Sequence, residues 1–332
     1  ILHETDIIKH VTMLFCITNP YNKNKDRDMS YIESALSSSK NFFKKKQLVI
    51  LESTVYPGAT EEYFLKTFKE RGLVVGKDIF LGYSPEREDP GNKNFNISNI
   101  TKLVSGYSKP CLIKCEKLYK SINIKTQKVS SIKTAEITKL YENIFRSVNI
   151  GLVNEMKLIA DKMEIDIHEI IEAAKSKPFG FQPFYPGPGL GGHCIPIDPY
   201  LLTWKAKQYD MNTKFIELSG DINNSMPNYV IDKIGNALNS CEKSFQKSKI
   251  LILGIAYKKN VDDIRESPSL KIIELLKSKG ASINFHDKYV KNLKISLSNK
   301  VVKIKSIQLS KSKLTSYDLV CIVTDHDNID YK

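Results

Sequence analysis

Short apolar runs alternate with longer amphipathic stretches along the first third of the chain. The runs at 11–17, 48–51 and 79–83 are typical of buried strands, and the segments between them favour helices and turns. Alternating strands and helices predict a parallel α/β sheet, which binds ligands at the carboxyl ends of its strands. Ser30 and Glu33 have the spacing of a capping box at the start of the first helix. Helices are expected at 31–45, up to about residue 69 and at 109–121, with short strands at 102–106 and 126–130.

From about residue 133 to 163 the apolar positions recur every three or four residues, which predicts a long amphipathic helix. This helix exceeds the average globular length and is expected to bridge two domains or to contact a partner subunit. Its period is set by Ile137, Leu140, Ile144, Val148, Leu152, Met156, Ile159 and Met163. Further helices are expected at 166–175, 199–209 and 215–240.

A second α/β unit is predicted after residue 249. Strands are expected at 249–254, 281–286 and 318–324, and Asp287 follows the second of them. A turn over 255–267 leads into a helix that ends near residue 279. The pattern is that of a nucleotide-binding domain, although no G-x-G-x-x-G fingerprint follows any strand in either half.

Together these elements predict an α/β protein with two Rossmann-like parallel-sheet domains joined by a long central helix. The chain opens at Ile1 without an initiator Met and lacks a glycine fingerprint, so we expect an incomplete N-terminal domain. If a dinucleotide is bound, the first βαβ unit of its domain is expected upstream of Ile1.

The amino-acid composition excludes some classes of function. The 332 residues carry a net charge of +13, but only five of the 50 basic residues are arginine, and the lysines are spread along the chain. Nucleic-acid readers cluster their charge and use Arg at base edges, so we expect no nucleic-acid partner. No apolar run is long enough for a membrane span. Six cysteines without regular spacing favour free thiols, no metal site and a reducing, cytoplasmic location.

One stretch concentrates candidate chemistry. Residues 183–200 crowd glycines and prolines around Cys194, which excludes regular structure and predicts a rigid, shaped loop. A thiol held there, with Asp198 four residues on, is a candidate nucleophile beside a carboxylate. The alternative is a buried, inert cysteine in a glycine-rich turn.

Five motifs, in order over nearly the whole chain, resemble the UDP-sugar 6-dehydrogenase family, and most closely its UDP-N-acetylglucosamine branch. They are Leu51-Glu-Ser-Thr-Val-Tyr-Pro-Gly58, Tyr83-Ser-Pro-Glu-Arg-Glu-Asp-Pro-Gly-Asn92, Glu136-Ile-Thr-Lys-Leu-Tyr-Glu-Asn143, the loop 186–198 and Gly254-Ile-Ala-Tyr-Lys-Lys-Asn-Val-Asp-Asp-Ile-Arg-Glu-Ser-Pro268. The resemblance implies oxidation of a primary alcohol at sugar C6 to a carboxylate, with two NAD⁺ reduced in turn, for surface polysaccharide synthesis.

The resemblance also implies the catalytic roles. Cys194 would form a thiohemiacetal and then a thioester, because an aldehyde can lose hydride only from a tetrahedral adduct. Lys139 and Asn143, four apart on one helix face, would stabilise the oxyanion and position a water. Asp198 and Glu86 would handle protons or orient the attacking water.

Each assignment has a structural alternative. Lys139 and Asn143 fit solvated helix positions, Glu86 a loop carboxylate, and Asp198 the N-cap of the following helix. His193 is adjacent to Cys194, but neighbouring side chains usually diverge, so its role as the base is left open.

The resemblance implies cofactor contacts from Thr54 and Arg265. Arg87 would face the acetamido sugar or the diphosphate. The family's usual Val-Pro-Thr-Pro after the first strand is Ile17-Thr-Asn-Pro20 here, which weakens any cofactor contact from residue 19. Contacts to UDP are carried over to Phe184, Tyr185, Gly189, Tyr257 and Lys258.

These inferences give three predicted domains. Residues 1–132 would be the C-terminal part of an NAD-binding domain, 133–243 a central helical and dimerisation domain with the cysteine loop, and 244–332 a UDP-binding domain truncated at its end. The helix at 133–163 is expected to form a homodimer or a higher homo-oligomer.

Several alternatives stay open. A β-hydroxyacid dehydrogenase uses a helix Lys and Asn, but it needs neither the Cys194 loop nor a second α/β unit. UDP-N-acetylmannosamine and UDP-glucose are other candidate substrates. An inactive sugar-nucleotide-binding fragment is the alternative from a different class.

Overall fold

The computed structural model describes residues 12–17, 28–89, 95, 98–192, 194–297 and 300–331, with backbone alone at Cys194 and at residues 296, 297 and 300. The chain forms two compact units. Unit 1 comprises residues 1–144 and 197–213, and unit 2 comprises residues 145–196 and 214–332. The α/β class with two Rossmann-like sheets is thereby confirmed, while the three-domain division stays a prediction.

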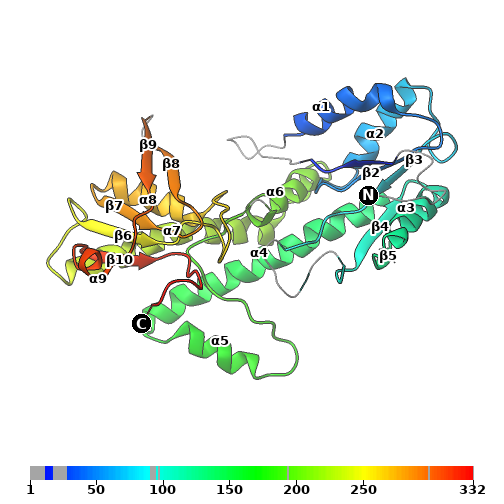
Figure 1. The fold of residues 1–332 in the computed structure, drawn as a ribbon. Helices are drawn as coiled ribbons and strands as arrows, with labels where there is room; N and C mark the ends of the chain where they lie inside the picture. The colour runs from blue at the N-terminus through cyan, green and yellow to red at the C-terminus, as the bar shows by residue number, and fades with distance from the viewer. Residues whose placement is uncertain are drawn as a thin grey trace. The chain divides into compact units, whose positions relative to one another are not determined.

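Unit 1 contains a five-stranded sheet in the order β1-β2-β3-β4-β5 (Figure 1). Strands β1, β2 and β3 are parallel, as predicted, but β4 runs antiparallel to β3. A parallel neighbour needs a crossover of a dozen or more residues, usually helical, and no helix is described between β3 and β4. The strands are β1 (Met13–Phe15), β2 (Leu48–Leu51), β3 (Phe80–Tyr83), β4 (Lys102–Gly106) and β5 (Thr126–Lys128).

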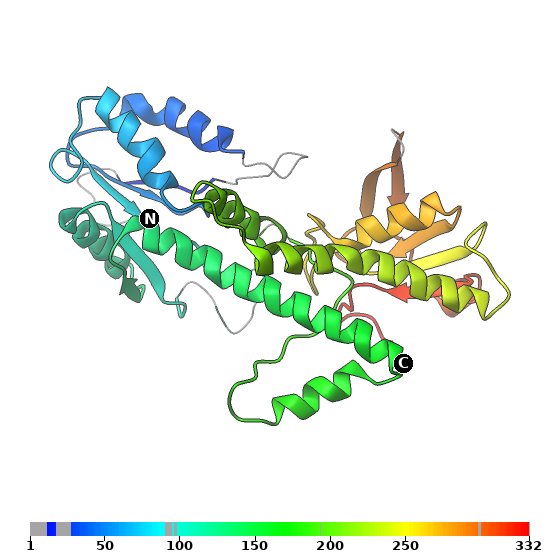
Figure 2. The same ribbon diagram turned by 180° about the vertical axis from the view of Figure 1, so that it is seen from behind.

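Helices cover both faces of this sheet. Helices α1 (Ser30–Ser39) and α2 (Ala59–Glu70) lie on one face, and α3 (Lys109–Ser121) lies on the other (Figure 1, Figure 2). The predicted first helix ends earlier than expected, in a 3₁₀ turn, η1 (Lys40–Phe42). The predicted capping box is wrong, because Met29 occupies the N-cap position and the Asp28 carboxylate accepts from the Ser30 N–H instead.

The long helix α4 (Ile132–Lys162) is confirmed, and the boundary between the two units falls within it. Only some of the apolar residues that recur along this helix are buried. Leu140 and Ile144 are buried, but Leu152 and Ile159 are about half exposed and Met163, just beyond the helix, is 63% exposed. Polar residues share the buried positions of the helix with apolar ones: Glu136, Lys139, Asn143, Ser147 and Asn154.

Glu136 fixes the start of α2 within unit 1. Its carboxylate accepts hydrogen bonds from the Gly58 N–H at 2.5 Å, the Thr60 N–H at 2.9 Å and the Thr60 hydroxyl at 2.7 Å. A carboxylate at a helix N-terminus accepts from N–H groups that have no partner within the helix and interacts favourably with the positive end of the helix dipole. Burial raises the pKa of Glu136, although the bonds from Thr60 and Gly58 work against that rise.

Unit 2 is built on a three-stranded parallel sheet, β10-β6-β7, with α7 and α8 packed against it (Figure 1). Fully buried side chains of Ile250, Ile252, Ile272 and Phe285 lie in the core between these layers, where each contributes roughly 1.5–3 kcal/mol. The elements are α7 (Lys214–Asn239), β6 (Lys249–Leu253), α8 (Pro268–Ser278), β7 (Ser282–His286), α9 (Lys311–Leu314) and β10 (Leu319–Ile322).

Two elements of the second half differ from expectation. Helix α6 (Cys194–Lys207) begins five residues before the predicted start, so Cys194 is its first residue. An antiparallel hairpin, β8 (Asn292–Leu297) and β9 (Lys300–Lys305), was not predicted and joins the edge of β7 through a bridge between Phe285 and Ser306. The short helix α5 (Ile167–Lys175) lies where it was predicted.

We expect Glu136→Gln to lower the free energy of unfolding by about 1–3 kcal/mol, because its amide would direct a donor at an N–H group. Urea unfolding measures this loss. Glu155, exposed on the same helix, is the matched control, and Glu155→Gln should change stability by less than about 0.5 kcal/mol. Equal losses in both variants would contradict the anchoring role of Glu136.

Candidate active site

A buried polar cluster in unit 1 unites three predicted catalytic residues. Lys139 and Asn143 lie one turn apart on α4 and are 9% and 3% exposed, so the solvated alternative for them is wrong. The Asn143 Nδ2 donates to Asp198 Oδ2 at 2.6 Å. Asp198 is 3% exposed and lies inside α6, so it is not the N-cap of that helix.

The environment of Asp198 suits proton transfer near neutrality. Burial raises the pKa of Asp198 from 3.8 to about 7, although the hydrogen bond from Asn143 and the charge of Lys139 pull it down. A general acid or base works best when its pKa lies near the working pH. The cluster therefore offers one carboxyl that exchanges a proton at neutral pH, beside one amide donor and one ammonium group.

Tyr83 adds a buried hydroxyl to this part of unit 1. Within the described part of the chain its Oη has no hydrogen-bond partner, although the side chain is fully buried. Burial raises the pKa of Tyr83 well above its usual value, and the charges of Glu136 and Asp198 add to the rise. Buried hydroxyls are normally paired, so this donor fits a site that a ligand or a water completes.

Glu86 follows β3 and is held by a buried lysine. Lys102 Nζ lies 3.0 Å from Glu86 Oε2 and 3.2 Å from Glu52 Oε1. Partial burial opposes the charged form of Glu86, but Lys102 and the backbone N–H groups of Glu88 and Arg87 outweigh it and lower the pKa. Glu86 is thus an ionised, oriented carboxylate. Sequence reasoning missed Lys102, whose only signal was a charge at the start of a buried strand.

The Arg87 side chain is hydrogen-bonded within unit 1. Its guanidinium donates to Glu142 at 3.3 and 2.6 Å and to the Thr101 carbonyl at 2.7 Å, which together use three of its five N–H groups. Ile100 and Lys102, with Glu86 and Arg87, line a cavity of about 10 Å³. That volume corresponds to roughly one water molecule. The cavity therefore suits a water beside the Glu86 carboxylate.

The glycine-rich loop belongs to unit 2 up to its end at Cys194. The Gly187 N–H donates to Asn154 Oδ1 at 2.9 Å, and the Gly192 N–H donates to the Arg265 carbonyl at 2.9 Å. Gly189 has φ +132°, which only glycine adopts readily. His193 and the Cys194 side chain lie outside the described residues, as do Asn19 and Pro20 of the predicted cofactor loop.

Within unit 2, the glycine loop packs on the turn after β6. A Cβ added to Gly191 would lie 2.6 Å from Tyr257 Cβ, and one added to Gly192 would lie 2.9 Å from the Tyr257 ring. Tyr257 and Lys258 are both half-buried. The structure therefore brings the loop that carries Gly189 against the turn that carries Tyr257 and Lys258, all predicted to contact UDP.

The remaining residues predicted to bind UDP or NAD have the following neighbours in the structure. Phe184 packs edge to face on Phe145 with ring centroids 5.9 Å apart, and the exposed Tyr185 donates to Glu172 at 2.7 Å. Thr54, half-buried, follows β2 in unit 1, whereas Arg265 is exposed in unit 2 and pairs with Asp263 at 2.7 Å. The roles of all these residues stay predictions.

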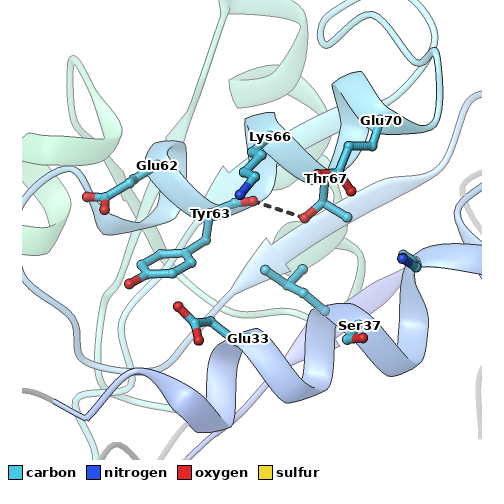
Figure 3. Close-up of a pocket in the computed structure, with 9 residues that line it drawn as sticks. Glu33, Ser37, Glu62, Tyr63, Lys66, Thr67 and Glu70 are labelled. Carbon is cyan, nitrogen blue, oxygen red and sulfur yellow. Dashed lines mark hydrogen bonds between the residues drawn. The ribbon is translucent and has the colours of Figure 1, made fainter.

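A groove of about 590 Å³ lies between α1 and α2, and Figure 3 shows its lining side chains. Glu33 reaches into it from α1, while Tyr63, Lys66 and Glu70 line it from α2. It contains none of the predicted site residues. We therefore place the candidate site at the buried cluster instead.

Two further findings concern metals and membranes. The described ranges hold no group of three or more His, Cys, Asp or Glu side chains arranged to bind a metal ion. Among the helices of those ranges, none has the length and hydropathy required to cross a bilayer.

Rossmann-like sheets bind nucleotides at the carboxyl ends of their strands, which places the protein in the class of nucleotide-binding α/β proteins. Models of the UDP-glucose/GDP-mannose dehydrogenase family match the chain in three parts: the NAD binding domain at 3–123, the central domain at 133–225 and the UDP binding domain at 251–332. The chain belongs to this family, which includes NAD-dependent UDP-sugar dehydrogenases. The predicted family and its cofactor, NAD, are confirmed.

Relatives support the assignment. Protein CapL of Staphylococcus aureus is 37% identical over 85% of the chain and 66% of its own length. The UDP-N-acetyl-D-glucosamine 6-dehydrogenase of Pseudomonas aeruginosa is 35% identical over 86% and 68%. The UDP-D-ManNAc dehydrogenase structure from Pyrococcus horikoshii has a TM-score of 0.84 at 32% identity, covering 95% of this chain and 71% of that one. The chain thus spans about two thirds of the length of these relatives.

We expect stability to depend on the protonation of Asp198. Because its folded pKa of about 7 exceeds its ordinary 3.8, its contribution is present below about pH 4 and is lost as the pH rises through 7. Asp198→Asn keeps an acceptor for Asn143 but does not ionise. From pH 4.5 to 8 the wild type should lose roughly 2–4 kcal/mol relative to this variant. Urea unfolding at both pH values checks this, and a constant difference would contradict it.

Proposed function

We propose that the protein oxidises the C6 hydroxymethyl group of UDP-N-acetylglucosamine to a carboxylate, with NAD⁺ accepting a hydride in each of two steps. One observation carries the proposal: α6 begins at Cys194, and Asp198, one turn further along it, bonds to Asn143 in a buried cluster with Lys139. A thiol, a carboxyl that titrates near neutrality, an amide and an ammonium group are what a four-electron oxidation through a thioester requires.

The chemistry proceeds in three stages. Removal of a proton from the C6 hydroxyl and of hydride from C6 gives the aldehyde. The Cys194 sulfur then adds to the aldehyde carbon, and loss of hydride from this adduct leaves a thioester. Water attacks the thioester carbon, the C–S bond breaks and the thiol is regenerated. A thiolate at the first residue of a helix is favoured by the helix N-terminus.

The buried cluster supplies the remaining functions. The Lys139 ammonium and the Asn143 amide would donate to the oxygen that becomes negative when the sulfur or water adds. Asp198, with a pKa of about 7, would take and return protons at that oxygen or at the thiol. Glu86, which Lys102 keeps ionised, would orient the hydrolytic water from the adjacent small cavity.

Nucleotide binding is assigned to the glycine-rich loop and to turns that follow strands. Gly189, Tyr257 and Lys258 would hold the uridine diphosphate, and the packing of the glycine loop on Tyr257, through Gly191 and Gly192, supports this. Phe184 and Tyr185 would line the same site. Thr54 and Arg265 would contact NAD.

The choice of sugar rests on Arg87. Three N–H groups bonded to Glu142 and Thr101 fix the position of Arg87, and these bonds among the described residues leave its other two N–H groups for an acetamido carbonyl. The P. aeruginosa relative is named for UDP-N-acetyl-D-glucosamine, whereas the P. horikoshii protein is named for the manno epimer. We therefore keep UDP-N-acetylmannosamine as the second candidate substrate.

The exposed apolar stripe of α4 supports a homodimer. Ile137, Leu152, Met156 and Ile159 are each 38–56% exposed along one helix, which is typical of a surface that a second copy covers. We place the reaction in the cytoplasm, where a catalytic thiol stays reduced. There it would serve the synthesis of a surface polysaccharide.

We expect Cys194→Ser in the full-length protein to abolish NADH formation from the UDP-sugar while UDP binding stays within about twofold. The hydroxyl is a far weaker nucleophile than the thiolate and cannot form the thioester. Stopped-flow absorbance at the NADH band and calorimetry with UDP measure the two effects. Cys241→Ser, at an exposed position, is the control and should turn over normally. Substantial turnover in Cys194→Ser would refute the role of the thiol.

We expect kcat/KM for UDP-N-acetylglucosamine to exceed that for UDP-glucose at least about a hundredfold, a difference of roughly 3 kcal/mol. A site built around an amide leaves buried polar groups unpaired when the sugar carries only a hydroxyl. Competition assays on the full-length protein measure the ratio. Equal values, or preference for the manno or galacto epimer, would overturn the choice of substrate.

A further inference from the structure

A fully buried carboxylate–imidazole pair lies beside the turn that follows β6 in unit 2. Asp287 Oδ2 accepts from the backbone N–H groups of Ile255 at 2.8 Å and Ala256 at 3.2 Å, and lies 3.0 Å from His326 Nε2. Its other oxygen, Oδ1, accepts from the N–H groups of Tyr289 at 2.8 Å and Val290 at 3.0 Å. One carboxylate therefore joins the turn after β6, the turn after β7 and the segment after β10.

The hydrogen bonds of His326 define its tautomer. The Asn260 backbone N–H donates to Nδ1 at 2.9 Å, so Nδ1 carries no proton. The proton of the neutral ring is therefore on Nε2, which donates to Asp287. Both ring nitrogens are used, and the ring is fully buried. Asp287 bonds directly to the start of the turn, at Ile255 and Ala256. Through His326 it is also linked to the middle of the turn, at Asn260.

Side chains beyond the pair strengthen the same attachment. The Thr324 hydroxyl donates to the Ala256 carbonyl at 2.6 Å, and Asn260 Nδ2 donates to Asp327 Oδ2 at 2.7 Å. Gly254, at φ +78°, lets the chain pass so close to Thr324 that an added Cβ would lie 2.1 Å from its carbonyl oxygen. The turn is therefore fixed at both ends by one network.

Tyr257 and Lys258 lie between the two attachment points, Ala256 and Asn260. With both points fixed, only three residues of backbone separate them, and their φ and ψ angles have little freedom. The Tyr257 ring packs against Gly191 and Gly192, so its position also sets how the glycine loop approaches. The attachments thus determine the geometry of both segments predicted to hold the nucleotide.

We propose that Asp287 and His326 are positioning residues for the diphosphate nucleotide: they act through the 255–260 turn and do not themselves touch the ligand. This inference rests on the proposed binding of UDP to unit 2. The hydrogen bond from a neutral imidazole to a buried carboxylate contributes only modest net stability, because folding exchanges bonds to water for it. Its specific effect is a pre-organised turn, which lowers the ordering cost of binding.

The test compares three variants of the full-length protein. His326→Phe keeps a ring but removes both hydrogen bonds. His326→Asn restores an acceptor near the place of Nδ1 and so retains the bond from the Asn260 N–H. His286→Phe is the matched control, because the His286 ring, at the end of β7, bonds to the Ile307 carbonyl and not to the turn. Calorimetry with UDP, steady-state kinetics and thermal unfolding are measured for each.

We expect His326→Phe to raise the Kd for UDP and the KM for the UDP-sugar at least about tenfold, with kcat at saturation within about twofold, because the turn loses its order and the chemistry is unchanged. His326→Asn should recover most of this affinity, and His286→Phe should bind UDP normally.

Two outcomes would overturn the inference in different ways. If the wild type binds UDP but His326→Phe binds it equally well, whatever its melting temperature, the pair serves stability alone and only the positioning role falls. If the wild type does not bind UDP, the proposed function of unit 2 falls and the inference falls with it.

Discussion

The buried polar face of α4 is the constraint on which most of the structure depends. Glu136, Lys139, Asn143 and Asn154 lie at spacings of three, four and eleven residues, which places them on one side of the helix. A buried polar group without a partner costs about 1–3 kcal/mol, so other elements must supply partners. In unit 1 these are the N-terminus of α2 and the carboxylate of Asp198; in unit 2 they are α7, through Asn223, and the glycine loop.

In both units, buried side chains hold polar groups in place near the strand ends. A nucleotide or sugar site needs polar groups that stay oriented when no ligand is present, and a free side chain would lose entropy on binding. In unit 1, Lys102 bridges two carboxylates and holds Glu86. In unit 2, Asp287 and His326 hold backbone instead of a reactive side chain. Groups behind the predicted sites thus determine the geometry of the groups proposed to face a substrate.

The sequence predicted the regular elements well, because their apolar periods are strong. The helix at 109–121 and the strand at 48–51 match the structure residue for residue. The start of α6 was missed because Pro196 and Pro199 suggested a break, yet Pro196 lies in the first turn, which tolerates proline, and Pro199 lies inside the helix. The hairpin of β8 and β9 was missed because lysines interrupt its apolar residues. Family motifs gave the candidate residues, but only folding brings Lys102 to Glu86 or Asp198 to Asn143.

Because burial raises the pKa of Asp198 to about 7, this carboxyl binds and releases a proton near neutral pH. At a pH near 7 the buried carboxyl exists in both forms, so a molecule that binds beside it and favours one form must take up or release a proton. Linkage is reciprocal, so the proton affects the affinity for that molecule to the same extent. Under the proposed function, substrate affinity and pH would be coupled through this one side chain, and the heat of binding would depend on the buffer that exchanges the proton.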